Sequence, residues 1–99
     1  MEILKMYETE ISSCNILRVA AGTNGLKDGD SGHGSRTIIE IEDRGGTNIN
    51  FKITPNMGNG LIEIRLGGDT ELETIIQAFE FIVRTLKRQV DKEAQYARQ

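Results

Sequence analysis

The sequence contains no tryptophan, one proline, one cysteine and one histidine, and only 5% of its 99 residues are aromatic. A single cysteine excludes an intramolecular disulfide and fits a reducing compartment, where we expect Cys14 to be a small core residue. No apolar run approaches the roughly 18 residues that span a membrane. The first ten residues, MEILKMYETE, carry acids where a secretory signal carries bases. These absences predict a cytoplasmic protein.

The chain also has fewer basic than acidic residues. Twelve Lys and Arg residues stand against 15 Asp and Glu residues, which gives a net charge of −3. The chain therefore lacks an overall basic field that would hold a polynucleotide, and we expect no DNA binding. Residues 84–99 are the exception, because they contain five basic and two acidic residues and carry a net charge of +3. This end attracts small anions, although a solvated charged tail is the ordinary alternative.

The apolar pattern predicts a single α+β domain that covers residues 1–99. Segments with alternating or β-branched apolar residues are typical of strands, and there are five of them: 2–10, 14–20, 36–42, 48–54 and 61–66. Residues 43–46 and 55–60 supply the Gly, Asn and Pro that tight connections need. The expected architecture is an antiparallel sheet of about five strands, followed by a long C-terminal helix that packs on the sheet.

The helix is predicted to begin at Asp69 or Thr70 and to continue without Gly or Pro towards Arg98. At full length it measures about 43 Å, whereas a six-residue strand measures about 20 Å. Its core stripe is expected to consist of Leu72, Ile75, Ile76, Phe79, Ile82, Val83, Leu86 and Val90. Six of these, Leu72, Ile76, Phe79, Val83, Leu86 and Val90, alternate at spacings of four and three, as in a coiled-coil seam. The helix is therefore expected to mediate homo-oligomerisation; the alternative is that the stripe only covers the sheet.

A glycine-rich connection over residues 22–36 is the most unusual segment. Its five glycines let backbone N–H groups approach an anion, while Thr23 and Asn24 add neutral donors and His33 and Arg36 add charge. This composition indicates a phosphate or nucleotide cradle, although it matches neither a phosphate-loop nor a dinucleotide fingerprint. A flexible surface loop is the alternative.

On the helix, a second group of residues suits an anionic ligand. At 100° per residue, Phe81, Arg84 and Arg88 share the face opposite the expected core. An aromatic ring stacks on a base, and guanidinium groups pair with phosphates in bidentate fashion. Alternatively, Glu80 pairs with Arg84 and Phe81 packs on a neighbouring subunit.

Catalytic and metal chemistry have little support. Asp28, Asp30 and His33 offer at most three metal ligands, and neither Cys14 nor a serine has a motif that places it beside His33. We therefore predict no catalytic residue, no metal, no cofactor and no enzymatic activity, with a small nucleotide hydrolase as a competing hypothesis.

Three segments resemble a known family: SSCNILRV at 12–19, the glycine-rich segment with GDSGHGSRT at 29–37, and LGGDTEL at 66–72. They resemble the first-described Thoeris anti-defence sponges, small phage proteins that bind and hold the cyclic ADP-ribose isomers made by bacterial TIR-domain enzymes. The resemblance spans residues 12–88. It implies an antiparallel sheet with helical packing and dimers or hexamers. It also implies nucleotide pockets that two protomers build from arginines and an aromatic or apolar residue.

Some members of that family also hold cyclic oligonucleotides of the CBASS defence system at separate sites. The resemblance and the residue chemistry together suggest ligand contacts at Arg18, Thr23, Asn24, His33, Arg36, Met57, Phe81, Arg84 and Arg88. The expected function is to sequester cyclic nucleotide signals without cleaving them, in the cytoplasm of the host bacterium. The alternative is a small interaction module that inhibits a host enzyme through its helix face.

Overall fold

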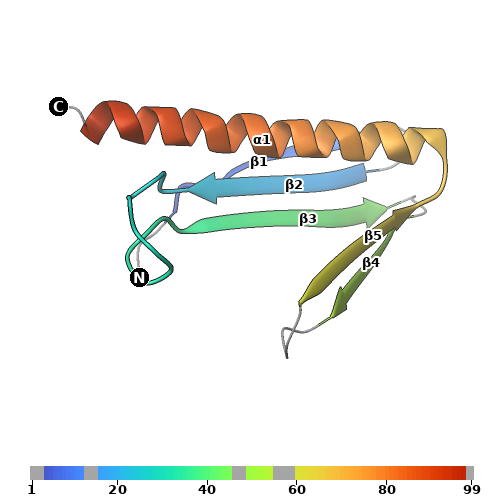
Figure 1. Cartoon of the computed structure of the whole chain (residues 1–99). Helices are drawn as coiled ribbons and strands as arrows, with labels where there is room; N and C mark the ends of the chain where they lie inside the picture. The colour runs from blue at the N-terminus through green and yellow to red at the C-terminus, as the bar shows by residue number, and fades with distance from the viewer. Residues whose placement is uncertain (1–3, 13–15, 46–48, 55–59, 98–99) are drawn as a thin grey trace.

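The structure is a computed structural model that describes residues 4–12, 16–45, 49–54 and 60–97, the last four by backbone alone. Five strands precede one helix (Figure 1): β1 (Tyr7–Ser12), β2 (Ile16–Thr23), β3 (Thr37–Gly45), β4 (Ile49–Thr54), β5 (Leu61–Leu66) and α1 (Asp69–Ala97). The predicted α+β class, five antiparallel strands and C-terminal helix are confirmed. The expectations for Cys14 and Met57 fall on residues outside the described ranges.

The five strands are divided between two sheets. Strands β1, β2 and β3 form an antiparallel sheet with β2 in the centre, and β4 pairs with β5 in a separate hairpin. Sequence alternation predicts the strands but does not reveal this division. The hairpin leaves the end of the larger sheet at a steep angle and points away from α1 (Figure 1).

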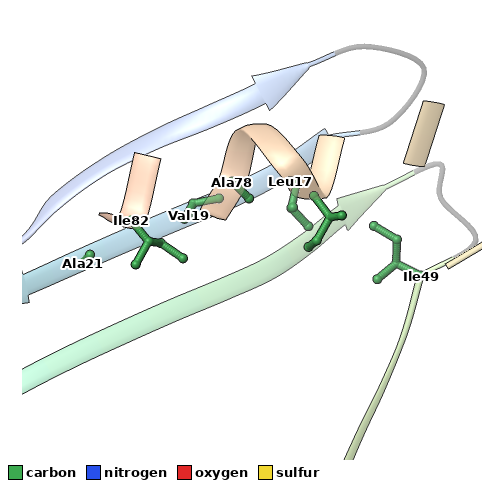
Figure 2. Packing of buried hydrophobic residues seen from close by; sticks show 7 residues of the cluster. Leu17, Val19, Ala21, Ile49, Ala78 and Ile82 are labelled. Atoms are coloured by element: carbon green, nitrogen blue, oxygen red, sulfur yellow. The ribbon is translucent and has the colours of Figure 1, made fainter. Parts of the chain in front are cut away.

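The core lies between β2 and the N-terminal half of α1 (Figure 2). Leu17, Val19 and Ala21 alternate along β2 towards the helix and are 0% exposed. They pack with residues of α1 and with Ile49 at the start of β4; the helix residues are Ile75, Ala78 and Ile82. Because α1 is centred on β2 and also touches β1, it leaves the same face of β3 partly open.

The helix presents a different face to the sheet from the one predicted. Its buried side chains are Thr74, Ile75, Ala78, Ile82 and Thr85. At 100° per residue this face is rotated by about 90° from the predicted centre at Phe79. Leu72, Ile76, Phe79 and Val83, expected in the core stripe, are 46–54% exposed, which is compatible with their other expected role as a seam.

Small side chains explain this rotation. Ala78 and Ala21 allow the helix backbone to approach β2 closely, and both are fully buried. The hydroxyl of Thr74 donates to the carbonyl of Thr70 at 2.9 Å, which satisfies a polar group that burial would otherwise penalise. Phe81, expected on the face opposite the core, instead packs partly buried against the core cluster.

Candidate functional site

The glycine-rich connection between β2 and β3 is closed at its base by hydrogen bonds. The backbone N–H of Asn24 donates to the carbonyl of Arg36 at 3.2 Å, and the N–H of Arg36 donates to Oδ1 of Asn24 at 2.7 Å. The hydroxyls of Thr23 and Thr37 lie 2.9 Å apart. Asn24 and Thr23 are both buried, so these two predicted ligand contacts hold the loop together.

Asp30 occupies backbone amides of the loop that an anion would use. The N–H of Gly32 donates to Oδ1 of Asp30 at 2.9 Å, and the N–H of His33 donates to the same oxygen at 3.3 Å. Nδ1 of His33 lies 3.4 Å from that oxygen. The Gly32 amide, and then His33, hold the pKa of Asp30 below its usual value. A carboxylate of the chain itself thus fills part of the expected phosphate cradle.

The guanidinium group of Arg36 is also engaged inside the loop. Nη1 donates to the carbonyls of Gly34 and Ser35 at 3.3 and 3.1 Å, and Nη2 donates to the carbonyl of Gly32 at 3.2 Å. Arg36 and His33 border a hollow of about 550 Å³. Arg36 already donates three hydrogen bonds to carbonyl oxygens, so this hollow is expected to bind anions more weakly than the sequence suggested.

Arg18 lies on the face of the sheet that points away from the helix, between its buried neighbours on β2. It is surrounded by carboxylates, with N–O distances of 2.6 Å to Glu8, 3.1 Å to Glu40 and 3.9 Å to Glu42. Its hydrogen bonds to Glu8 and Glu40 raise its pKa above the usual value. An anionic ligand would have to displace these three side chains.

A groove between β1 and α1 offers a different environment. Its basic end is a pocket of about 330 Å³, which lies within the usual range for small-molecule sites. The pocket is lined by two aromatic rings, three cations and two neutral side chains: Tyr7, Phe81, Arg84, Thr85, Arg88, Gln89 and Lys92. The ammonium group of Lys5 lies 5.3 Å from the ring centroid of Tyr7, so a fourth cation borders this end.

The two arginines of this groove differ from the others. Within the described part of the chain, Arg84 and Arg88 form no ion pair with a carboxylate and no side-chain hydrogen bond. By contrast, Arg18, Arg36, Arg44 and Arg65 all donate to oxygens of the chain. The alternative pairing of Glu80 with Arg84 is therefore not part of the described structure. Both groove arginines are exposed and free to bind an external anion.

The opposite end of the groove is less basic. A second hollow of about 450 Å³ shares Phe81 and Arg84 with the basic pocket and adds Thr9, Gln77 and Glu80. Glu10 also borders it, but Glu10 pairs with Arg18 in the register, so its carboxylate lies on the far face of the sheet, 3.9 Å from Arg44. Amide, hydroxyl and carboxylate oxygens accept hydrogen bonds from hydroxyl and amino groups. The groove therefore changes from basic to polar along its length, with Phe81 common to both ends.

Gln89 fixes the wall of the groove to the base of the loop. Its Oε1 accepts a hydrogen bond from the backbone N–H of Thr23 at 3.0 Å, and its Nε2 donates to the carbonyl of Lys5 at 2.9 Å. The side chain thereby joins α1 to the end of β2 and to the segment before β1. These bonds connect the basic end of the groove to two segments that are distant in sequence.

The predicted ligand contacts thus fall into three places. Phe81, Arg84 and Arg88 meet in the groove, as their helical spacing suggested. Thr23, Asn24, His33 and Arg36 lie in the loop, and Arg18 lies on the far face of the sheet. Sequence reasoning missed Tyr7, Gln89 and Lys92. Lys92 continues the four-residue spacing of Arg84 and Arg88 and was detectable, whereas Tyr7 comes from another element.

Other chemistries have few candidate residues. Among the described residues, no three His, Cys, Asp or Glu side chains gather as a metal ion would require. The described part of α1 is too polar to serve as a membrane-spanning helix. Comparison with known proteins found no family model, no curated protein and no solved structure that matches the chain.

Proposed function

We propose that this protein binds a small nucleotide anion in the groove between β1 and α1 and holds it without chemical change. The single observation that carries this proposal is the pair Arg84 and Arg88. They are the unpaired arginines of the described chain, and both line one pocket that also contains Phe81 and Tyr7. Unpaired guanidinium groups beside aromatic rings are suited to phosphate and base recognition.

The polarity of the groove favours a nucleotide over a simple anion. The basic end, with Arg84, Arg88 and Lys92, suits a diphosphate. The polar end, with Thr9, Gln77 and Glu80, suits the hydroxyl groups of a ribose. Cyclic ADP-ribose isomers combine a base, two riboses and a diphosphate, and the resemblance in the sequence points to the same compounds. The proposed role is sequestration of such a signal in the manner of Thoeris anti-defence sponges, extending to cyclic oligonucleotides of CBASS.

A sponge needs only rigid, preorganised donors, because no bond is made or broken. The groove meets this requirement, since Gln89 ties α1 to Thr23 and to Lys5.

The competing proposal is an interaction module that inhibits a host enzyme through the helix face. Leu72, Ile76, Phe79 and Val83 form an exposed apolar row on α1, which is the feature such a module would use. The two proposals differ in a direct way. A sponge is stabilised by a small molecule and releases it intact, whereas an interaction module binds a protein and shows no small-molecule stabilisation.

The test is to mix the purified protein with cyclic ADP-ribose isomers and, separately, with cyclic trinucleotides. The complex is isolated by native mass spectrometry, denatured by heat, and the released compound is identified. Release of intact ligand at a fixed stoichiometry supports the proposal. Release of an altered product points to a hydrolase, and no bound compound from either class overturns the proposal.

The site is tested with Arg84→Ala and Arg88→Ala by titration calorimetry. Each change removes a charge-assisted hydrogen bond worth about 1.5–3 kcal/mol, so the affinity should fall about 10- to 150-fold. Lys87→Ala is the matched control, because it removes one charge from the same turn of α1 but does not line the basic pocket. Equal affinity losses in all three variants would show only a general charge effect and would refute this site.

A further inference from the structure

The β4–β5 hairpin has one apolar face that leaves the core. In the antiparallel register Ile49 lies opposite Leu66, Phe51 opposite Ile64, and Ile53 opposite Ile62, so these six residues share one face. Along β4 the exposed fraction rises from 7% at Ile49 to 39% at Phe51 and 71% at Ile53. The face thus begins inside the core and ends in solvent.

This exposure is unfavourable for an isolated hairpin. A two-stranded hairpin is only marginally stable in water unless its apolar face packs on something else. Ile62, at the free end of the hairpin, is 70% exposed. The opposite face carries polar residues such as Lys52 and Glu63, which lie across from each other. The hairpin is therefore amphipathic, and its apolar side lacks a cover among the described residues.

A second uncovered apolar surface lies on the helix and on β3. Leu72, Ile76, Phe79 and Val83 are about 140° around α1 from the groove with β1, so they lie on the other flank of the helix. Ile39 of β3 pairs with Ala21 and so shares the helix-facing side of the sheet, yet it is 52% exposed because α1 is centred on β2. We call these five residues the shelf, and Phe51, Ile53 and Ile62 the arm.

The arm and the shelf together expose a large apolar area. From Leu72 to Val83 the helix rises about 17 Å, whereas Phe51 and Ile53 lie about 7 Å apart along β4, so the arm fits within the length of the shelf. With about 200 Å² for a fully exposed large side chain, the eight residues expose on the order of 800 Å². That sum equals what one partner contributes to a standard stable interface.

We propose that the arm of one copy packs on the shelf of a second copy of this chain, and that the second copy returns the same contact. Each copy carries both surfaces, so a two-fold arrangement covers all of them at once. Arg84 and Arg88 border both the groove and a hollow beside Ile76, Phe79 and Val83, so the contact lies next to the proposed ligand site. The tests below measure assembly without ligand, so their outcome is separate from that of the ligand titration.

The first test compares the oligomeric state of two variants by light scattering. The double variant Ile53→Lys with Ile62→Lys places two charges in the arm and should be a monomer of about 11 kDa. The control Asn50→Lys with Thr54→Lys adds the same charges to the opposite face of the hairpin and should assemble like the unchanged protein. A monomeric unchanged protein, or an arm variant that still assembles, overturns the proposal.

A complementation experiment guards against a variant that merely misfolds. A shelf variant, Phe79→Lys with Val83→Lys, should also be monomeric. When arm and shelf variants are mixed, the intact shelf of one and the intact arm of the other should restore a heterodimer with one of the two contacts. Recovery of mixed dimers supports the proposal, because misfolded chains would not complement each other. Failure of two folded variants to associate overturns it.

Cross-linking then identifies the contact itself. In a Cys14→Ser background, one chain carries Ile62→Cys and a differently tagged chain carries Val83→Cys. A disulfide between the two tagged chains is expected under mild oxidation, whatever the size of the assembly. Exclusive formation of disulfides between two Val83→Cys chains would indicate that helices pack on each other, and the arm-to-shelf contact would be refuted.

Discussion

The packing of β2 on α1 makes a quantitative prediction for Leu17→Ala. Leu17 is 0% exposed and belongs to a core cluster that contains seven buried side chains in the described part of the chain. Removing a buried leucine side chain costs about 3 kcal/mol, which combines lost transfer free energy with the cavity left behind. A domain of this size is stabilised by about 5–15 kcal/mol in total. The single change should therefore remove about a fifth or more of the free energy of unfolding.

Its neighbour Ile16 provides the matched control. Ile16 also belongs to β2 but is 37% exposed, so Ile16→Ala should cost only about 1 kcal/mol. Urea unfolding followed by circular dichroism measures both variants, at two widely different protein concentrations so that assembly is separated from folding. The melting temperature of Leu17→Ala should drop by about 12–24 °C. Equal losses for the two variants would refute the assignment of the core to the β2–α1 interface.

Two further predictions concern the glycine-rich connection and its approach. A Cβ on Gly22 would lie 2.5 Å from the sulfur of Met6, so Gly22→Ala should cost about 1–3 kcal/mol in urea unfolding. Gly32→Ala, where the nearest atom is 3.4 Å away, should change stability by less than about 0.5 kcal/mol; a larger loss there would contradict the loop geometry. The second prediction concerns Asp30, whose pKa is lowered in the folded chain by the amides that it accepts. The contribution of Asp30 to the free energy of unfolding is present above pH 3.8, which is its pKa in the unfolded chain, and is lost as the pH falls through its lower pKa in the folded chain. The amide resonances of Gly32 and His33 should therefore titrate below pH 3.8. Titration of these amides at or above 3.8 would show that the carboxylate does not bind them.

Local patterns in the sequence were sufficient to predict the strands and the helix. Alternating apolar residues predicted the bounds of β5, Leu61–Leu66, and the capping pattern predicted a helix start at Asp69 or Thr70; α1 begins at Asp69. Strand ends were less accurate: the strand predicted over 2–10 is Tyr7–Ser12, and the described residues 4–6 lie outside it. Propensity acts within a few residues, whereas the end of a strand depends on the length of its hydrogen-bonded neighbour.

The candidate site was only partly accessible from the sequence. Phe81, Arg84 and Arg88 were found because residues three and four apart on a helix share a face. Tyr7 was missed, since it is brought to the groove by β1, which is distant in sequence. Arg18 and Arg36 illustrate the reverse case. Their residue type suggested anion binding, but the fold surrounds Arg18 with glutamates and Arg36 with loop carbonyls.

The sequence alone determined the class of the fold, the order of its elements and the amphipathic character of α1, because these depend on the periodicity of neighbouring residues. The tertiary structure decided which face of the helix is buried. The apolar stripe of α1 is wider than one sheet covers, and the small residues Ala21 and Ala78 allow close approach at one side of that stripe. The other side, with Phe79 and Val83, is left exposed. The tertiary structure also separated the hairpin from the main sheet, because the path of the chain after β3 depends on long-range packing rather than on local pattern.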